Sequence, residues 1–518
     1  MRFSTETPDP ANSMTYPPAA TRSLMKSAWQ IFLRPLRDPL CRLALALLLA
    51  PLAVAHAAET KRPNIIVLLA DDLGYADLGC QGSTEVPSPN IDSIAAQGVR
   101  FTDAYVTAPQ CCPSRAGLLT GRYQNRFGYE SNESNKPRSA KHPAGLGGMP
   151  VGERTMGDRF KAAGYVTGMI GKWHLGSVLE GSKPFERGFD ETFWHPVGGV
   201  LLPDPKTGLL SDIYRGPVKV QEKEYSTDAF GREAVDFIGR HRDRPFFLYV
   251  AFVPPHEPLE AKPADLAKFA HVADLKRRTM LAMMASLDGN VGRVLDKLRE
   301  EKLEEDTLVF FVSDNGGVPH KNASRNVPCR GWKGQLLEGG IRVPFLAQWK
   351  GRLPAGEVYR QPVISLDILP TALAAAGVEV PPDWKLDGVD LLPYLTGAKQ
   401  GPPHDALYWR FRASGDPAFY DRWAIRQGDW KLVKTHMEPL GLYNLAADIG
   451  ESKNLADAEP ERVVAMKAAW DLWNKDNSEP FELSEVEPEA PADKSPEKKQ
   501  KKKKKNRPAP EAVSEDDR

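Results

Sequence analysis

Residues 64–72 read NIIVLLADD, an almost uninterrupted apolar run that ends in two carboxylates, Asp71 and Asp72. Such a run is typical of a strand that is buried on both faces, as in a parallel sheet covered by helices. Three similar apolar runs follow along the chain, at Tyr165–Ile170, Pro245–Val253 and Thr307–Val312. Helical patterns, such as Ile91–Gln97 and Arg277–Glu300, lie between them. This alternation predicts an α/β fold with a mostly parallel central sheet flanked by helices.

The composition excludes several classes of protein. Of the 518 residues, 41% are hydrophobic and 26% are charged, as in a globular protein with a sizeable core. Lys plus Arg equals Asp plus Glu at 68 each, so the overall charge gives no reason to expect a nucleic-acid partner. Five Cys in this length exclude a disulfide-built scaffold. An enzyme or binding protein of average composition remains.

The N-terminal segment has the pattern of an export signal. Basic residues precede the apolar stretch Leu43–Ala55, which ends at Ala55-His56-Ala57, a small-x-small cleavage pattern. The stretch is shorter than the roughly 20 residues that a membrane span needs. We therefore expect residues 1–57 to be a signal peptide, the mature protein to be periplasmic or secreted, and no stable membrane insertion. An uncleaved N-terminal anchor is the alternative.

The rest of the chain divides into three parts. We expect a catalytic domain at 58–385 and a C-terminal subdomain at 386–480. The subdomain is predicted to form a small antiparallel sheet and a closing helix, at Ala406–Arg410, Trp423–Arg426, Lys431–Lys434 and Pro460–Lys475. Residues 481–518 are rich in Lys, Glu and Pro, with 10 basic and 10 acidic residues from 482 onward, which predicts a disordered, solvated tail.

A polar segment follows each of the four apolar runs. These segments are Asp71-Asp72, Gly171–Gly176 (GKWHLG), Pro254–Pro258 (PPHEP) and Ser313–Gly317 (SDNGG). In an open α/β sheet, ligands bind beyond the carboxyl ends of the strands. Any one of these segments alone fits an ordinary turn, but four together favour a shared site at that edge.

The acidic members of this set favour a hard cation. Asp71, Asp72, Asp314 and Asn315 offer oxygen ligands, which suit Ca²⁺, and Ca²⁺ tolerates irregular geometry better than Mg²⁺ does. No Cys or His cluster has the spacing of a zinc site.

A cysteine pair begins the segment Cys111–Arg122, CCPSRAGLLTGR. Pro113 suits the first turn of a helix, which would place Cys111 at a helix N-terminus, where an anion is favoured. A buried thiol pair, or disulfides from the pair to Cys80 and Cys329, is the alternative.

This segment resembles the signature of the type I, formylglycine-dependent sulfatase family, C-x-P-S-R-x-x-x-L-T-G-R, at every fixed position. Five more segments resemble that family in the expected order: the Asp71-Asp72 pair, GKWHLG, PPHEP, SDNGG and Gly331–Pro344 (GWKGQLLEGGIRVP). Arg426–Trp430 and Leu442–Leu445 resemble its small terminal domain. The resemblance covers most of the mature chain. It implies an alkaline-phosphatase-like fold and an exported arylsulfatase or carbohydrate sulfatase of the bacterial type.

The resemblance also implies roles for individual residues. Cys111 would be oxidised by a sulfatase-maturing enzyme to formylglycine (3-oxoalanine), with Cys112 at a variable position. Asp71, Asp72, Asp314 and Asn315 would bind one Ca²⁺ together with the modified Cys111. Arg115 would hold the hydrated aldehyde, and Lys172 and Lys333 would bind sulfate oxygens. His174 would act on the aldehyde hydroxyl, and His256 with Lys333 would assist the leaving alcohol.

These roles imply hydrolysis of sulfate monoesters. A hydroxyl of the hydrated aldehyde would attack sulfur, with Asp314 taking its proton, and the second hydroxyl would then let the sulfated hydrate resolve. The alternatives are a phosphate or phosphonate monoester hydrolase of the same fold and an inactive sulfated-glycan-binding relative.

The implied substrate is a small or oligosaccharide sulfate ester. The contacts that select it are expected in the variable loops Tyr123–Pro150 and Val197–Thr227. His195 and His320 lie near the predicted edge, and for each a structural and a functional role are open. Trp173 is expected to serve packing.

Overall fold

The computed structural model describes residues 62–136, 146–199, 201–412, 422–436 and 438–478. The predicted signal peptide (1–57) and the predicted tail (481–518) therefore lie outside the described residues. Strand β1 (Asn64–Ala70) is buried at every position. Ile65, Val67 and Leu69 pack into one hydrophobic cluster, whereas Ile66 and Leu68 pack into a second cluster on the opposite face. Because both faces are covered, the run has no polar alternation.

A ten-stranded sheet has the order β11-β2-β10-β9-β1-β8-β4-β5-β6-β7. The remaining strands of this sheet are β2 (Val99–Phe101), β4 (Val166–Lys172), β5 (Glu191–His195), β6 (Tyr214–Arg215), β7 (Val218–Lys219), β8 (Phe246–Ala251), β9 (Thr307–Ser313), β10 (Phe345–Gln348) and β11 (Glu357–Tyr359). The neighbours β9, β1, β8, β4 and β5 are parallel, whereas β10, β6 and β7 pair antiparallel. The predicted mostly parallel sheet is confirmed, and its four apolar runs are the adjacent strands β9, β1, β8 and β4.

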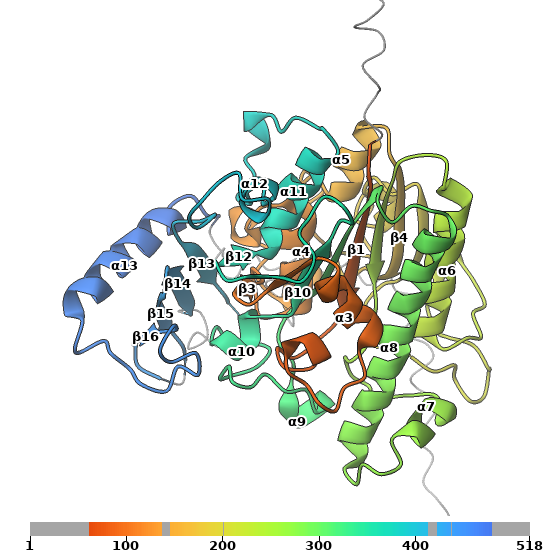
Figure 1. Ribbon diagram of the computed structural model, residues 1–518, viewed down its shortest axis with the longest axis horizontal. Coiled ribbons are helices and arrows are strands. Elements are labelled where there is room, and N and C mark those ends of the chain that lie inside the picture. The colour runs from red at the N-terminus through yellow and green to blue at the C-terminus, as the bar shows by residue number, and fades with distance from the viewer. Residues whose placement is uncertain (1–61, 137–145, 200, 413–421, 437, 479–518) are drawn as a thin grey trace, which may run out of the picture. The chain divides into compact units, whose positions relative to one another are not determined.

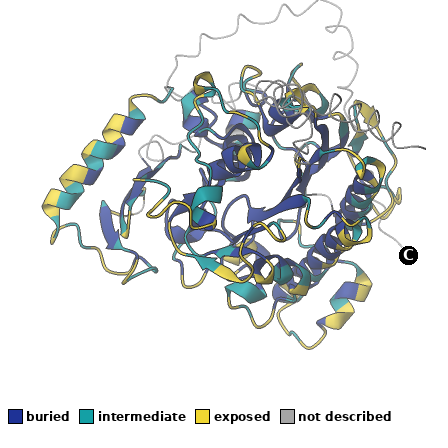
Figure 2. Cartoon of the chain, turned by 45° about the horizontal axis from the view of Figure 1, so that its top comes forward, coloured by how far each residue is buried: buried dark blue, intermediate teal, exposed yellow. Residues whose placement is uncertain are grey.

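Helices cover both faces of this sheet (Figure 1). One face carries α3 (Pro89–Ala96), α6 (Ser226–His241) and α8 (Leu275–Glu300), whose buried residues share a cluster with Ile66 and Leu68. The other face carries α4 (Cys111–Thr120), α5 (Met156–Ala162) and α11 (Ile368–Ala375). The shorter helices are α7 (Pro263–Lys268), α9 (Pro319–Asn322), α10 (Glu338–Ile341) and α12 (Leu392–Leu395). Figure 2 shows the strands of the sheet as a buried layer between partly exposed helices.

The C-terminal part forms a second sheet of four antiparallel strands. Its elements are β13 (Leu407–Arg410), β14 (Trp423–Gln427), β15 (Trp430–Lys434), β16 (Gly441–Asn444) and α13 (Pro460–Asn474). The three predicted strands and the closing helix are confirmed to within a residue or two, and β16 is an additional strand. A small pair of parallel strands, β3 (Ala104–Tyr105) with β12 (Val363–Ile364), lies between the two sheets in Figure 1.

The described part of the chain contains no helix that is both long and apolar enough to span a membrane. Its cysteines, Cys80, Cys111, Cys112 and Cys329, are all free. The alternative of disulfides from the cysteine pair to Cys80 and Cys329 therefore does not describe this structure.

Candidate active site

The strand register brings the acidic residues of two segments together. Ala70 at the end of β1 pairs with Ser313 at the end of β9, so Asp71 and Asp314 follow side by side. The backbone N–H of Asp314 donates to the Ala70 carbonyl at 3.1 Å, and that of Asp72 donates to Asp314 Oδ1 at 3.2 Å. Asp72 has a φ of 60°, a left-handed turn that short polar residues tolerate better than most others do. The two carboxylate segments meet at the sheet edge as predicted.

Cys111 is the first residue of α4 and is fully buried at this edge. Its Sγ lies 3.4 Å from Asp71 Oδ1, 3.9 Å from Asp72 Oδ1 and 3.1 Å from Lys333 Nζ. The next residue, Cys112, points away from the carboxylates, and its Sγ lies 3.1 Å from the Ser131 carbonyl. Among the described residues, Cys111 is therefore the one of the two adjacent cysteines whose thiol is hydrogen-bonded to Asp71 and Asp72.

The acidic side chains are matched by three buried or nearly buried cations. Lys172 Nζ lies 2.5 Å from Asp71 Oδ2, and Lys333 Nζ lies 2.7 Å from Asp72 Oδ1. Arg115 donates from Nε to Asp314 Oδ2 at 2.9 Å and from Nη1 to the Lys172 carbonyl at 2.9 Å. A charge of this kind is retained in the interior only when it is paired, so the pairs fix the geometry of the edge.

Two glycines permit this close approach. Gly171, with a φ of 102°, precedes Lys172, and a Cβ there would lie 2.0 Å from the Ala251 carbonyl oxygen of β8. Gly316 of the SDNGG segment leaves room for the Gly339 carbonyl, which would lie 1.9 Å from an added Cβ. A larger side chain at either position would move Lys172 or Asp314 out of place.

The two predicted catalytic histidines lie in different surroundings. His174 is partly exposed, but its Nδ1 is buried and has no hydrogen-bond partner among the described residues. His256 is partly exposed, and its Nε2 lies 3.7 Å from Asp72 Oδ2. Burial lowers the pKa of both rings, and the charge of Lys172 lowers it further. In the absence of a bound ion, both imidazoles are therefore neutral near pH 7.

The carboxylates at the edge differ in their acidity. Although burial opposes ionisation, Lys172, His256 and Arg115 hold the pKa of Asp71 well below its usual range. Burial, together with the neighbouring charge of Asp71, raises the pKa of Asp314. Burial and the charge of Asp71 also raise the pKa of the Cys111 thiol well above its usual value. An unmodified Cys111 is thus a protonated and poor nucleophile.

The arrangement fits a metal ion. The ligand atoms of Asp71, Asp72, Cys111 and His256 all lie within 4.8 Å of one another. The side-chain oxygen of Asn315 is buried without a hydrogen-bond partner among the described residues, an atom that a cation would satisfy. Asp314 Oδ2 is engaged by Arg115, so this carboxylate is turned partly away from the cluster.

The structure brings all the predicted site residues to one edge: Asp71, Asp72, Cys111, Arg115, Lys172, His174, His256, Asp314, Asn315 and Lys333. For His195 and His320, both a structural and a functional role were open, and the structure places them in different surroundings.

His195, at the end of β5, accepts hydrogen bonds from the Val197 and Gly198 N–H groups and so stabilises a turn. His320 is exposed and packs edge-on against Trp332, with 5.6 Å between the ring centroids. Trp173 is fully buried, as expected for a packing residue.

Two supporting residues were not predicted from the sequence. Asn322 Nδ2 and Ser324 Oγ donate to the Asp72 carbonyl at 3.1 and 3.2 Å. They stabilise the left-handed turn at Asp72. Their segment, Asn322–Ser324, carries no motif, and its contact with a residue 250 positions earlier is visible only in the fold.

Comparison with known proteins shows a consistent set of relatives. Residues 63–378 match the family model "Sulfatase", and residues 331–477 match "N-sulphoglucosamine sulphohydrolase, C-terminal". The chain is 36% identical over 376 residues to the N-acetylgalactosamine-6-sulfatase of Canis lupus familiaris, covering 69% of this chain and 70% of that protein. It is 33% identical over 472 residues to arylsulfatase A of Bos taurus, covering 80% and 88%.

A solved structure shares both fold and sequence with this chain. The crystal structure of Ps i-CgsB in complex with k-i-k-neocarrahexaose superimposes with a TM-score of 0.75 at 35% identity. The similarity covers 82% of this chain and 96% of that chain.

Proposed function

Because this chain belongs to the sulfatase family and is a sulfuric ester hydrolase, we propose that its reaction takes place at Cys111, after oxidation to formylglycine. The observation that carries this proposal is the position of Cys111 Sγ, which lies between two carboxylates and Lys333 Nζ at the first turn of α4. The raised pKa of the unmodified thiol argues against catalysis by cysteine itself.

We propose Ca²⁺ as the metal, with Asp71, Asp72, Asp314 and Asn315 as its protein ligands beside the modified Cys111. His256 lies close enough to the same cluster to contact it. The side chains of Asp71, Asp72, Asp314 and Asn315 offer hard oxygen donors, which Ca²⁺ prefers. The aldehyde supplies a hydroxyl nucleophile when hydrated, and the cation supplies charge that offsets the anionic ester.

The side chains at the edge would bind and orient the ester. The site has three formal positive charges, on Arg115, Lys172 and Lys333, and three formal negative charges, on Asp71, Asp72 and Asp314. A bound divalent cation would therefore give the site a net positive charge, which attracts an anion. Lys333 Nζ, at 3.1 Å from Cys111 Sγ, is placed to donate a hydrogen bond to an ester oxygen held there. Although burial opposes the charged form, the carboxylate of Asp72 raises the pKa of Lys333, so Lys333 stays protonated.

The two histidines would act on different protons. His256 is partly exposed and its Nε2 lies 3.7 Å from Asp72 Oδ2, which suits assistance to a departing alcohol together with Lys333. His174 is neutral near pH 7, and its buried Nδ1 lacks a hydrogen-bond partner among the described residues, which suits removal of a proton from the hydrated aldehyde.

We propose a sulfated carbohydrate as the substrate. The similarity to an N-acetylgalactosamine-6-sulfatase, and to a structure that holds a neocarrahexaose, supports this class of compound. A periplasmic or secreted location, reached through the signal pattern at residues 1–57, would place the enzyme where such polymers occur. A sulfatase-maturing enzyme is then the partner that oxidises Cys111.

One assay tests the proposed chemistry. Release of nitrophenol is measured from 4-nitrophenyl sulfate, phosphate and phenylphosphonate, with and without a chelator. We expect the sulfate ester to be the best substrate, with activity lost to the chelator and restored by Ca²⁺. A preference for either phosphorus ester would favour the phosphate or phosphonate hydrolase, and no turnover of any ester by protein carrying the aldehyde would favour the inactive binding relative.

A further inference from the structure

Asn322, the last residue of α9, is fully buried, and its side-chain amide uses all of its hydrogen-bonding capacity. Its Nδ2 donates to the carbonyls of Asp72, at 3.1 Å, and Pro255, at 3.2 Å. Its Oδ1 accepts from the N–H groups of Val318, at 3.2 Å, and Ser324, at 3.1 Å. A reversed amide would place its oxygen against two carbonyls and its nitrogen against two N–H groups, so these four bonds fix the orientation of the side chain.

The two carbonyls belong to segments that carry different parts of the candidate site. Asp72 lies in the turn after β1 and is a proposed metal ligand, whereas Pro255 follows β8 and immediately precedes His256. His256 Nε2 lies 3.7 Å from Asp72 Oδ2. Asn322 therefore joins, through one amide, the metal-ligand turn and the segment of the histidine proposed to assist the departing alcohol.

A backbone hydrogen bond joins the same two segments closer to the strands. The Asp71 N–H donates to the Pro254 carbonyl at 3.2 Å. Asn322 acts one residue further along both segments, where the chain has left the sheet and reaches His256. Removal of the Asn322 amide should therefore leave the strand ends paired, while Asp72 and His256 lose a shared support.

Ser324 offers an internal comparison. Its Oγ donates to the same Asp72 carbonyl at 3.2 Å, and its backbone N–H donates to Asn322 Oδ1. Among the described residues, its hydroxyl makes no hydrogen bond to the Pro255 carbonyl. Loss of the Ser324 hydroxyl should therefore loosen the Asp72 turn and leave the His256 segment in place.

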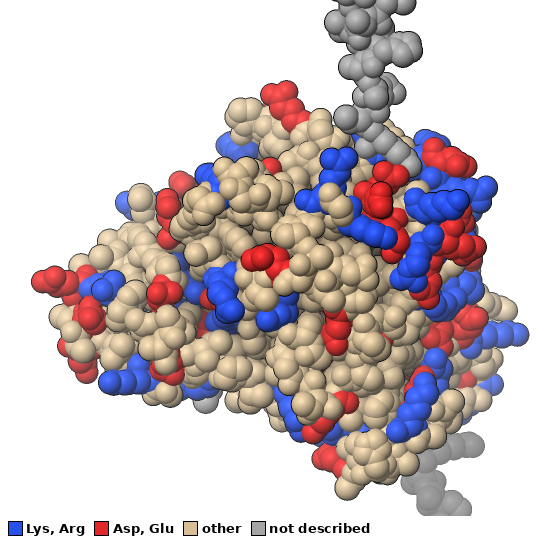
Figure 3. All heavy atoms as spheres, viewed as in Figure 1, with Lys and Arg blue, Asp and Glu red and all other residues tan. Residues whose placement is uncertain are grey.

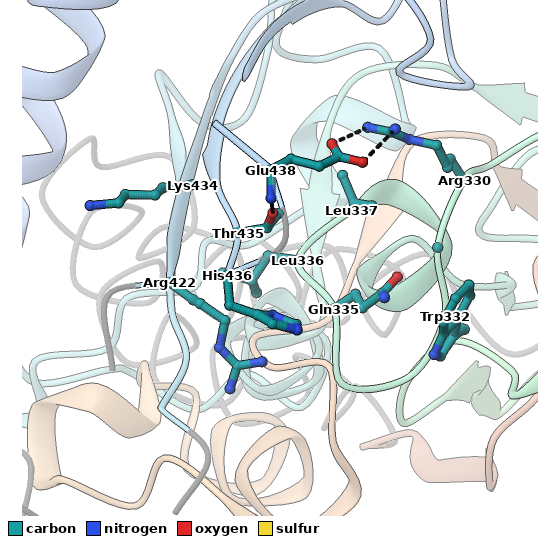
Figure 4. Close-up of a pocket in the computed structure, with 11 residues that line it drawn as sticks. Arg330, Trp332, Gln335, Leu336, Leu337, Arg422, Lys434, Thr435, His436 and Glu438 are labelled. Atoms are coloured by element: carbon teal, nitrogen blue, oxygen red, sulfur yellow. Dashed lines mark hydrogen bonds and ion pairs between the residues drawn. The ribbon is translucent and has the colours of Figure 1, made fainter. Parts of the chain in front are cut away.

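A second side chain that holds Asp72 comes from a more open part of the chain. Lys333 Nζ lies 2.7 Å from Asp72 Oδ1. Residues of its segment, 330–337, line a pocket of about 170 Å³ (Figure 4). Because this pocket borders the Lys333 segment on one side, the fully buried amide of Asn322 is the more rigid support for Asp72.

The placement of groups inside the site matters because the surface in view supplies no orienting field. On the face drawn in Figure 3, basic and acidic side chains are interspersed. Charges of mixed sign on that face do not orient an anionic ester. The alignment of a bound ester therefore depends on fixed groups within the site.

We propose that Asn322 is a positioning residue of the sulfatase reaction, which sets the placement of Asp72 relative to His256. This inference rests on the proposed function, because it takes Asp72 as a metal ligand and His256 as the residue that assists the departing alcohol. The one amide then serves both tasks: it holds the ligand in place for the cation, and it keeps the histidine within reach of the bound ester. Loss of a residue that orients a metal ligand typically weakens metal binding by roughly 10–100-fold.

Four variants form the test. Asn322→Ala and Asn322→Asp both remove the amide donor, and the second keeps the volume of the side chain and an oxygen that can accept from the Val318 and Ser324 N–H groups. Ser324→Ala removes only the hydroxyl donor. Asn125→Ala is the matched control, because Asn125 is also fully buried and its Nδ2 donates to a backbone carbonyl, that of Arg410 at 3.0 Å, beyond the C-terminal end of α4.

The first measurement needs no substrate. The Kd for Ca²⁺ is obtained from the Ca²⁺ dependence of Tm. Asn322→Ala and Ser324→Ala should each raise this Kd about tenfold, because each loses a donor to the Asp72 carbonyl. Asn125→Ala should keep the wild-type Kd.

The second measurement compares leaving groups at saturating Ca²⁺. The value of kcat/KM is determined for 4-nitrophenyl sulfate and for phenyl sulfate, because phenol is a weaker acid than nitrophenol and needs more assistance to leave. In both Asn322 variants the ratio of phenyl to nitrophenyl sulfate should fall about tenfold, since a small displacement of an assisting group is costly. Ser324→Ala and Asn125→Ala should keep the wild-type ratio. In a His256→Ala background, Asn322→Ala should lower the ratio little further.

The outcomes separate this inference from the proposed function. An unchanged ratio in both Asn322 variants, or an unchanged Kd for Ca²⁺ in Asn322→Ala, overturns the role of Asn322 and leaves sulfate hydrolysis in place. A ratio that falls as far in Ser324→Ala, or effects of Asn322→Ala and His256→Ala that simply add, overturns it as well. Failure of both Asn322 variants to fold would show that Asn322 serves the core instead. If wild-type protein that carries the aldehyde hydrolyses neither ester, the proposed function fails, and this inference fails with it.

Discussion

At the scale of single residues, Asp72 joins most parts of the site. Its carboxylate contacts Lys333 and Asn315 and lies 3.7 Å from His256 Nε2. Its carbonyl accepts hydrogen bonds from Asn322 and Ser324. The side chain is therefore placed by the protein before any cation arrives. A preformed set of oxygen ligands binds a cation with less reorganisation than a flexible set does.

A thermal-shift measurement tests the metal at this residue. Ca²⁺ at 100 times its Kd should stabilise the wild type by about 2.7 kcal/mol, because ligand that binds only the native state shifts the folding equilibrium. Asp72→Asn keeps the volume of the side chain but removes a charged ligand, so the Ca²⁺-dependent rise in Tm should be largely lost. Asp296→Asn, on the exposed side of α8, should keep it. Equal Tm values for the wild type with and without Ca²⁺ would show that the cluster binds no Ca²⁺.

The two histidines should differ in their kinetics. With His174→Ala, the first step should proceed and the second stall, which gives a burst of about one equivalent of nitrophenol per active site followed by a slow rate. With His256→Ala, the first step itself should slow, without a burst. The defect should be smaller for nitrophenyl sulfate than for a sugar sulfate, because nitrophenol needs little protonation to leave. Burst-free kinetics that are identical in both variants would contradict this division of roles.

At the scale of elements, the segment that enters the C-terminal sheet is fixed by an ion pair. His404 Nε2 lies 2.9 Å from Asp367 Oδ1, at the start of α11. Burial opposes the charged ring, but the carboxylate of Asp367 raises the pKa of His404 above its ordinary value of 6.5. Protonated His404 thus stabilises the native state.

The sign of this effect predicts a pH dependence. A raised pKa in the folded state gives a contribution that is complete below pH 6.5 and is lost as the pH rises through the folded-state pKa. The Tm difference between wild type and His404→Gln should therefore be largest near pH 6 and shrink toward alkaline pH. A difference that grows with pH would contradict the assignment.

The extent to which sequence predicts elements follows from their environment. β1 is buried on both faces, so its apolar run marks its ends correctly, and β9 extends one residue beyond the predicted run. β4 was predicted to end at Ile170 but continues through Gly171 and Lys172, because Gly171 packs against β8 and Lys172 pairs inside the site. The two-residue strands β6 and β7, at one end of the sheet, carry no apolar pattern and were not predicted.

At the scale of the whole molecule, the two sheets are connected by buried charges. Lys431 of β15 lies fully buried between Glu338 of α10 at 2.8 Å and Glu451 at 2.9 Å. Glu338 also accepts from the Tyr105 hydroxyl at 2.6 Å. The resemblance to known sequences indicated a terminal domain, but the pairing of these residues, which lie far apart in the chain, depends on the packing of one sheet on the other.

Removal of the buried charge of Lys431 should lower the free energy of unfolding. Lys431→Met leaves Glu451 buried without its cation, while Glu338 keeps Arg342 at 3.1 Å, and we expect a loss of about 3–5 kcal/mol of unfolding free energy in urea at pH 7. Lys467→Met breaks an exposed pair with Asp471 on α13, and should cost under about 1 kcal/mol. Similar losses for the two variants would contradict a structural role for the buried cluster.

The most direct test of the account is peptide mass spectrometry of protein produced together with a sulfatase-maturing enzyme, read alongside sulfate release. We predict a thiol-to-aldehyde change at Cys111, an intact thiol at Cys112, and a specific activity that rises in proportion to the aldehyde fraction. Cys112→Ser should keep most of the activity, whereas Cys111→Ser should lose it. Full activity in protein whose Cys111 is unmodified, or an aldehyde at Cys112 with Cys111 intact, would contradict the central claim.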